Sequence, residues 1–207
     1  MYNIKLTVLA VVVQLLIGCA VAPLSSPSTA RSLGGGEPNL MINLVPAGVD
    51  WSIGVSSDID VGLGAESQIA PLVYSWAKYS VVNRPEKGAV ALLGGVFYSE
   101  GIENSTGQGY YLGPIFSYKA GKAEWYLVPR YNRVNWAAGG GAASSADGSF
   151  SFVLEPIDGV FDYFQVNAGL NLWFSEKFGM NVSALCLKPS GQALACVAPL
   201  LAIGWRM

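Results

Sequence analysis

A period of two along residues 164–184 constrains the fold of this chain more than any other feature. Apolar and polar side chains alternate in residues 164–174 and again in residues 178–184, and residues 175–177 separate the two runs. Successive side chains of a strand point to opposite faces, so each run has one apolar and one polar face. The polar face of the first run is nearly uncharged and carries Gln165, Asn167, Asn171 and Trp173. The pattern predicts an antiparallel hairpin with hydrocarbon on one side and a narrow, wet lumen on the other.

Composition agrees with a membrane environment reached through strands. Of the 207 residues, 52% are hydrophobic and only 13% are charged, and the mean hydropathy is +0.39. Beyond the N-terminus no apolar run approaches the roughly 18 residues that a membrane-spanning helix needs. The net charge of -2, without blocks of like charge, gives no electrostatic footprint for nucleic acid, so no nucleic-acid partner is expected.

Similar alternation recurs from residue 37 onward. We expect ten strands, at residues 40–45, 51–55, 59–66, 72–82, 89–98, 110–119, 123–134, 164–174, 178–184 and 193–206. Short connections alternate with long ones at residues 100–109 and 137–159, which is typical of outer-membrane barrels with short periplasmic turns. The segment 150–153 could extend a neighbouring strand.

The predicted fold class is all-β, a closed antiparallel up-and-down transmembrane β-barrel of about ten strands. Closure is required because an unpaired backbone group in hydrocarbon costs several kcal/mol. Eight or twelve strands also fit, since residues 137–159 could hide another hairpin. The alternative is a lipid-tethered, lipocalin-like soluble barrel, but such a barrel needs a charged exterior, and this chain has few charges to cover one.

The N-terminus has the pattern of a targeting segment. Lys5 precedes an apolar stretch, residues 6–17, and Leu16-Ile17-Gly18-Cys19 resembles the bacterial lipobox. The resemblance implies cleavage before Cys19 and acylation of that residue. Ordinary signal cleavage after Ala22 is the rival, although Pro23 would then follow the scissile bond directly.

Three segments follow from this interpretation. Residues 1–18 are the lipoprotein signal peptide, residues 19–36 a flexible lipid tether rich in Ala, Ser, Pro and Gly, and residues 37–207 the barrel. Ala20 after the cysteine, in place of aspartate, resembles enterobacterial lipoproteins that are exported to the outer membrane. The expected location is therefore the bacterial outer membrane, both lipid-anchored and membrane-spanning.

The C-terminal residues 201–207 alternate and resemble the terminal strand that the bacterial barrel-assembly machinery recognises. The match differs from the usual signal because Met207 is last and the aromatic residue is Trp205. The resemblance implies the barrel-assembly machinery as a partner during insertion. Membrane lipid is the other expected partner, through the acyl anchor and the barrel exterior, and the sequence does not identify a protein partner.

Candidate chemistry is sparse because the chain contains no histidine. Histidine-dependent triads and histidine-ligated metals are therefore excluded, and we expect no catalytic residue, cofactor or metal. Charged and polar side chains on the inward faces are expected to form a network that fills the lumen: Asp60, Glu66, Lys78, Glu124, Arg130, Asn132, Gln165, Asn167, Asn171 and Trp173. Acid–base work by paired carboxylates is the alternative. Most tryptophans and tyrosines are expected in interfacial girdles.

Two cysteines remain once Cys19 is assigned to lipid. Cys186 and Cys196 flank a turn, and in an oxidising compartment they could form a cross-strand disulfide. Strict alternation opposes this bond because it puts the two residues on opposite faces. A bulge near Pro199 would restore the parity.

The function expected from these patterns is a structural or interaction role without catalysis. A lumen of about ten strands is usually filled by side chains, so a small pore or ligand conduit ranks second to this role. An enzyme is the third class.

Overall fold

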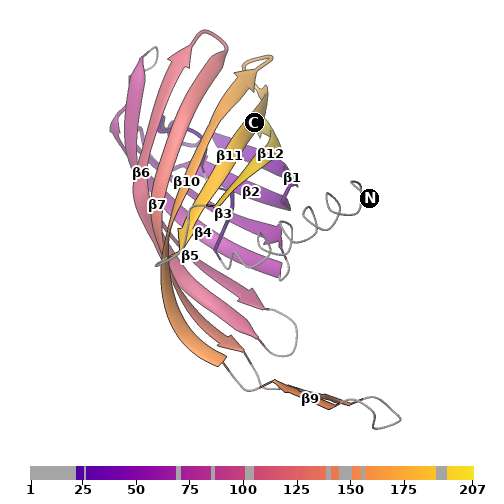
Figure 1. The fold of residues 1–207 in the computed structure, drawn as a ribbon. Coiled ribbons are helices and arrows are strands. Elements are labelled where there is room, and N and C mark those ends of the chain that lie inside the picture. Colours follow the sequence, from indigo (N-terminus) through magenta and orange to yellow (C-terminus); the bar gives the residue numbers. More distant parts are fainter. Residues whose placement is uncertain are drawn as a thin grey trace, which may run out of the picture.

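The computed structural model describes residues 22–25, 27–68, 71–84, 87–100, 105–138, 141–144, 151–154, 157–189 and 195–207. Ten antiparallel strands close into one barrel (Figure 1): β1 (Pro38–Val45), β2 (Ala47–Gly54), β3 (Ile59–Ser67), β4 (Pro71–Val82), β5 (Gly88–Glu100), β6 (Thr106–Ala120), β7 (Ala123–Ala138), β10 (Ile157–Trp173), β11 (Phe178–Pro189) and β12 (Ala195–Arg206). The predicted closed, up-and-down, ten-stranded barrel is confirmed. No helix in the described part of the chain is long and apolar enough to cross a membrane.

The first and last strands close the ring. β1 pairs with β12 from Asn39 opposite Arg206 to Asn43 opposite Ala202, and the Met207 amide donates to the Pro38 carbonyl at 3.0 Å. Closure pairs the edges that an open sheet would leave exposed. We call the end with the β2–β3, β4–β5, β6–β7 and β10–β11 connections the short-turn end, and the opposite end the long-loop end.

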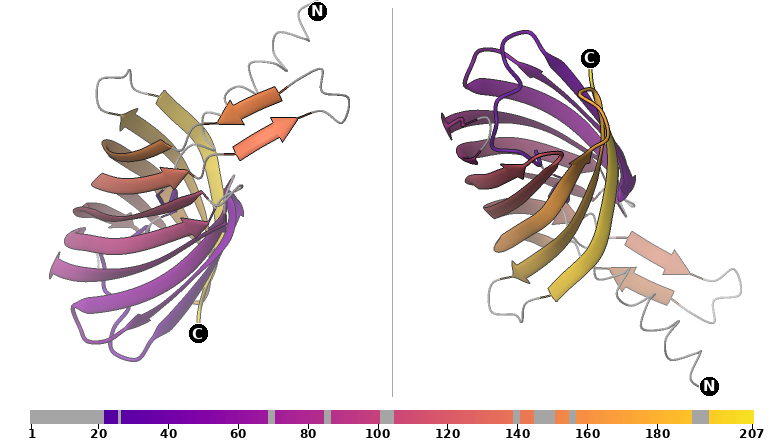
Figure 2. Two further views of the ribbon diagram at one scale, coloured as in Figure 1. Left: turned by 90° about the horizontal axis from the view of Figure 1, so that it is seen from below. Right: turned by 90° about the horizontal axis from the view of Figure 1, so that it is seen from above.

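The longest connection contains a hairpin of its own. β8 (Gly141–Ser144) pairs with β9 (Ser151–Leu154) in a separate two-stranded sheet, which stands apart from the barrel (Figure 2). The expectation that residues 150–153 extend a neighbouring strand is therefore wrong. Residues 151–154 pair with residues 141–144 instead, while β7 and β10 pair with each other up to Ala138 opposite Ile157.

Alternation divides each barrel strand between an outer and an inner face. In β4, Val73 and Tyr79 are exposed, whereas Trp76 and Lys78 are buried inside. In β10, Phe164 is exposed on the outside while Gln165 is fully buried. The apolar and polar faces of the 164–184 hairpin thus become the outside and the inside of the barrel.

Several inner aromatic rings cover glycines of the adjacent strand. A Cβ added at Gly62 would overlap the ring of Trp76, its partner across the β3–β4 ladder. The same relation holds at Gly64 with Tyr74, Gly95 with Tyr111, and Gly169 with Tyr126. A ring that lies over a glycine occupies the volume that a side chain would otherwise fill, so it takes little space from the centre of the lumen. The expected girdle is therefore wrong for Trp76, Tyr111 and Tyr126, which are all buried.

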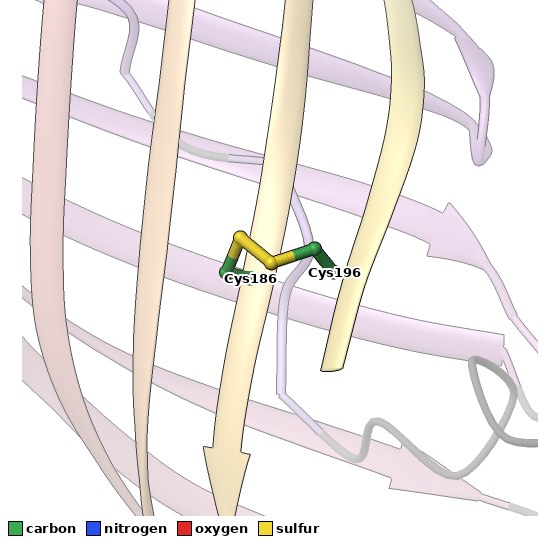
Figure 3. Close-up of a disulfide and its surroundings, with 2 residues drawn as sticks. All are labelled: Cys186 and Cys196. Carbon is green, nitrogen blue, oxygen red and sulfur yellow. A yellow bond between two sulfur atoms is a disulfide. The ribbon is translucent and has the colours of Figure 1, made fainter. Parts of the chain in front are cut away.

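A disulfide joins Cys186 of β11 to Cys196 of β12, which face each other in the ladder with Cα atoms 4.0 Å apart (Figure 3). The parity problem is resolved by a register shift. Ser183 pairs with Leu200 but Leu185 pairs with Val197, so β12 contains one extra residue at this point. This bulge lies beside Pro199, whose ring nitrogen cannot donate to a ladder.

Replacing Gly62 by valine should destabilise the barrel by about 1–3 kcal/mol, because the new side chain forces the Trp76 ring off the wall. Urea unfolding in detergent, followed by tryptophan fluorescence, measures the change. Gly94→Val is the matched control, since a Cβ at Gly94 would come no closer than 3.5 Å to its nearest neighbour. Equal effects of the two substitutions would contradict the proposed packing.

Candidate functional site: a lumen filled by the N-terminal segment

Residues 22–25 and 27–36, which we call the strap, run through the lumen from one end to the other. Near β1, the Leu33 amide bonds Asp60 at the start of β3. At the far end, the Leu24 amide bonds Glu66 near the end of the same strand. Six residues of strand separate these two carboxylates, which corresponds to about 20 Å. The strap therefore spans the height of the wall that it contacts.

The strap differs from the expected flexible tether. Ala22 and Ala30 are fully buried, and Leu24, Ser28 and Arg31 are nearly so. The composition of this segment predicts disorder because the segment has little apolar surface of its own. Inside the barrel, the wall supplies both the apolar contacts and the hydrogen-bond partners that the segment lacks in isolation.

At the short-turn end, an ion pair on the wall holds the strap. Asp60 and Lys78 pair at 2.7 Å with both side chains buried. Asp60 also accepts hydrogen bonds from the Leu33 amide at 3.0 Å and the Ser32 hydroxyl at 2.8 Å. Lys78 donates to the carbonyls of Thr29 and Arg31. The pair thus offers an acceptor and a donor to successive residues of the strap.

Arg31 provides a second fixed point. Its Nε lies 3.1 Å from Glu124, which also accepts a 2.7 Å hydrogen bond from the Thr29 hydroxyl. The other guanidinium nitrogens of Arg31 donate to the backbone carbonyls of Arg84 and Lys87, between β4 and β5. Between these contacts, the Ala30 amide donates to Ser117 and the Ala30 carbonyl accepts from Ser80.

At the long-loop end, Glu66 accepts bonds from the Leu24 amide at 3.0 Å and from the Ser25 amide at 2.9 Å, as well as from the Ser25 hydroxyl. Arg130 donates to the Ser25 carbonyl at 3.1 Å, and its guanidinium lies 4.8 Å from the centre of the Tyr111 ring. These contacts hold the backbone of the strap against β3 and β7.

Side-chain amides of β10 bind the carbonyls of the strap. Gln165 reaches the carbonyls of Pro23 and Leu24 at 3.3 and 3.4 Å. Asn167 reaches the Leu24 carbonyl at 3.5 Å, and Asn171 reaches the Ser28 carbonyl at 2.9 Å. The amide-rich face of the 164–174 run is therefore a row of donors for an extended backbone.

The structure places all the expected lumen residues inside, but it joins them differently from the expected network. Within the described residues, Asp60 and Lys78 form the only ion pair between two members of the expected network. Glu124 pairs instead with Arg31 of the strap. Asn132 is fully buried, and its side-chain amide has no partner among the described residues. Trp173 lies beneath the guanidinium of Arg206, which is 4.1 Å from its ring centre.

Three charged residues of the lumen were missed: Asp50, Arg31 and Arg206, which lines the cavity beside Trp173. Asp50 is buried and accepts a 3.0 Å bond from the Trp76 indole; the expected strand began one residue too late to include it. Arg31 is the single charged residue between positions 20 and 36. The sequence contains one indication of its role: the expected inward faces carry more carboxylates than cations, so a further cation is needed to balance their charge.

Little space remains around the strap. A cavity of about 40 Å³ lies between the strap and the wall formed by β1, β2, β11 and β12, lined by Asp50, Lys78, Trp173 and Arg206 among others. A second cavity, beside Ser25 and Tyr126, measures about 20 Å³. Ligand pockets are usually about 300–1,000 Å³, so these cavities suit a few water molecules. No group of three potential metal-ligating side chains occurs in the described part of the chain.

Comparisons with known proteins give no family assignment. No family model and no curated protein matches the chain. Among solved structures, Ail, the attachment invasion locus protein of Yersinia pestis, is 12% identical, with 83% of this chain and 99% of Ail covered and a TM-score of 0.41. The N-terminal β-barrel domain of Pseudomonas aeruginosa OprF is 11% identical, with 84% and 99% covered and a TM-score of 0.39. At these values the similarity carries no conclusion about this chain.

Replacing Glu66 by glutamine should loosen the long-loop half of the strap, because two backbone amides lose a charged acceptor. A hydrogen bond to a charged group contributes about 1.5–3 kcal/mol, so amide exchange of Leu24 and Ser25 should accelerate roughly 10- to 100-fold. Hydrogen-exchange mass spectrometry of the detergent-solubilised protein measures this. Glu176→Gln, in the exposed β10–β11 turn, is the control. Unchanged exchange in Glu66→Gln would refute the role of this carboxylate.

Proposed function

We propose that the chain is an outer-membrane β-barrel lipoprotein with a structural or interaction role, whose lumen is closed by its own strap. The observation that carries the proposal is the apolar exterior around a charged interior. On β6 the outward side chains include Tyr110, Leu112, Phe116 and Tyr118, all exposed. Eight residues separate the two tyrosines, about 26 Å along the strand, which suits the apolar band of a membrane barrel.

Exposed aromatic side chains lie toward both ends of this band. Toward the short-turn end are Tyr79, Tyr118, Trp125, Phe174 and Trp205. Toward the long-loop end are Tyr98, Tyr110 and Phe164. Aromatic rings favour the interface between hydrocarbon and water, so this distribution supports a spanning orientation.

The charged side chains support the same conclusion. Among the described residues, the well-exposed charged side chains lie in turns, at strand ends, or level with the aromatic residues of the long-loop end. They are Glu37, Arg84, Lys87, Glu100, Lys122, Arg133, Glu176, Lys177 and Lys188. Six other charged side chains of the wall are buried inside it: Asp50, Asp60, Glu66, Lys78, Glu124 and Arg130. A soluble lipocalin-like barrel would require the opposite arrangement, so the membrane barrel is favoured over it.

An interaction role is favoured by the uneven rim at the long-loop end. β1 and β2 have eight residues each, whereas β6, β7 and β10 have 15, 16 and 17. The long strands extend as a three-stranded sheet, with the β8–β9 hairpin beyond it (Figure 1). Outside the membrane, this sheet offers polar side chains such as Gln108 and Asn135 to a partner.

Membrane integration should persist without the lipid. In Cys19→Ser cells, the protein should still sediment with outer membranes, resist carbonate extraction and migrate as a compact, boiling-sensitive form on gels. The reason is that the apolar exterior itself holds the barrel in the bilayer. Wild-type protein labelled with an alkyne fatty acid is the comparison, and loss of label in Cys19→Ser marks lipidation at that residue. Release of Cys19→Ser as a soluble protein would favour the lipid-tethered soluble barrel instead.

Deleting residues 23–33 should open the barrel. In planar bilayers the full-length protein should carry no steady current, whereas the deletion variant should conduct, because the strap fills the lumen. The wall then presents four carboxylates, Asp50, Asp60, Glu66 and Glu124, against three cations, Lys78, Arg130 and Arg206, so cations should pass preferentially. Boiling-sensitive migration verifies that the variant is folded.

Two outcomes would contradict the plugged barrel: a steady current through the full-length protein, or a folded deletion variant that stays closed. Full-length Glu66→Gln/Glu124→Gln gives a second measurement if the deletion fails to fold. Its strap keeps its length but loses two charged acceptors, so brief openings are expected. Of these two outcomes, only a steady current through the full-length protein favours the small-pore alternative.

A further inference from the structure

The two ends of the strap lie at opposite ends of the barrel. At the short-turn end, the Gly36 amide donates to the Gly54 carbonyl at 2.7 Å, just before the chain enters β1. At the long-loop end, the Ala22 carbonyl accepts a 3.1 Å bond from Gln68, directly after β3. Ala22, the first described residue of the strap, therefore lies at the long-loop end.

Chain length fixes the side on which Cys19 must lie. Three residues span at most about 11 Å when fully extended, so Cys19 stays within that distance of Ala22. Asp60 and Glu66 alone are about 20 Å apart along β3. The two cavities found beside the strap are small, about 40 and 20 Å³. Cys19 cannot reach the short-turn end.

Ala22 lies at the low part of the rim. Ala22 is tied to Gln68, beside the end of β3, which has nine residues. On one side of β3 lie β2 and, beyond it, β1, with eight residues each, and on the other side lies β4 with twelve; the tall strands β6, β7 and β10 lie elsewhere around the ring. A chain that leaves the lumen here has the shortest path over the wall to the surrounding lipid.

We propose that the strap carries the N-terminal side of the chain through its own barrel, so that acyl groups on Cys19 insert into the leaflet at the long-loop end, beside β3 and β4. This proposal rests on the proposed function, which supplies the membrane and the acylation. With short turns facing the periplasm, the long-loop end is the cell surface, and the anchor binds outer-leaflet lipid. The strap is then fixed at one end by β1 and at the other by lipid, so it cannot slide out of the lumen.

The test places one epitope at each end of the barrel. An epitope inserted between Ala20 and Val21 reports the side reached by the strap, and the same epitope inserted between Glu176 and Lys177 reports the short-turn end. On intact cells, antibody should bind the first variant and not the second. After the outer membrane is permeabilised, both should bind. Both variants must sediment with outer membranes and show the compact, boiling-sensitive form.

Each other outcome has a distinct meaning. If the 20/21 epitope is reached only after permeabilisation, the strap does not cross and the proposal fails while the membrane barrel stands. If only the 176/177 epitope is reached on intact cells, the barrel has the reverse orientation and the outer-leaflet anchor is refuted. If both variants are soluble in the periplasm, the proposed function itself fails.

A cross-link tests the crossing without inserted residues. The Ala30 amide lies 3.2 Å from the Ser117 hydroxyl inside the wall, so Ala30→Cys/Ser117→Cys should form a disulfide that mass spectrometry detects between the two peptides. Ala30→Cys/Phe116→Cys is the matched control, because Phe116 is the adjacent residue on the outer face. Absence of the 30–117 link in folded protein, or equal linking in both variants, would overturn the threaded strap.

Discussion

Buried charge in a lumen without bulk water governs the rest of this structure. The wall places four carboxylates inside, Asp50, Asp60, Glu66 and Glu124, against the buried cations Lys78 and Arg130. An unpaired buried charge is costly unless a partner or hydrogen-bond donors compensate it. The strap supplies both, because Arg31 pairs with Glu124 while backbone amides satisfy Asp60 and Glu66. Wall and strap therefore stabilise each other.

Room for the strap comes from the pairing of large and absent side chains across the ladder. A barrel of ten strands is narrow, and inward rings such as Tyr74 and Trp76 would ordinarily fill it. Because Gly64 and Gly62 stand opposite these rings, the rings take up space at the wall that other side chains would occupy. The small side chains of the strap then fit the remaining centre. Glycine positions in the wall and the composition of the strap are two aspects of one packing solution.

Alternation predicted the strands and the closed barrel well, because register and burial both follow a period of two. It failed where a segment has no period. The composition of the strap predicts a flexible tether because it offers little apolar surface to bury, and the partners of the strap lie as many as 143 residues away in sequence. Asp50 was missed by one residue at a strand boundary. The sequence does not predict the β8–β9 hairpin, because the pairing of residues 151–154 with 141–144 is visible only in three dimensions.

The wall binds the strap chiefly through its backbone. Carbonyl groups of the strap accept from wall side chains at eight positions, Ala22, Pro23, Leu24, Ser25, Ser28, Thr29, Ala30 and Arg31. Every extended residue presents a carbonyl, so this mode of binding tolerates change in strap side chains as long as they stay small. Arg31 is different, since its guanidinium joins Glu124 to two carbonyls near the β4–β5 turn. The uncharged amides of the 164–174 run therefore have a defined purpose: they bind an extended chain along its length, and the charged contacts set its register.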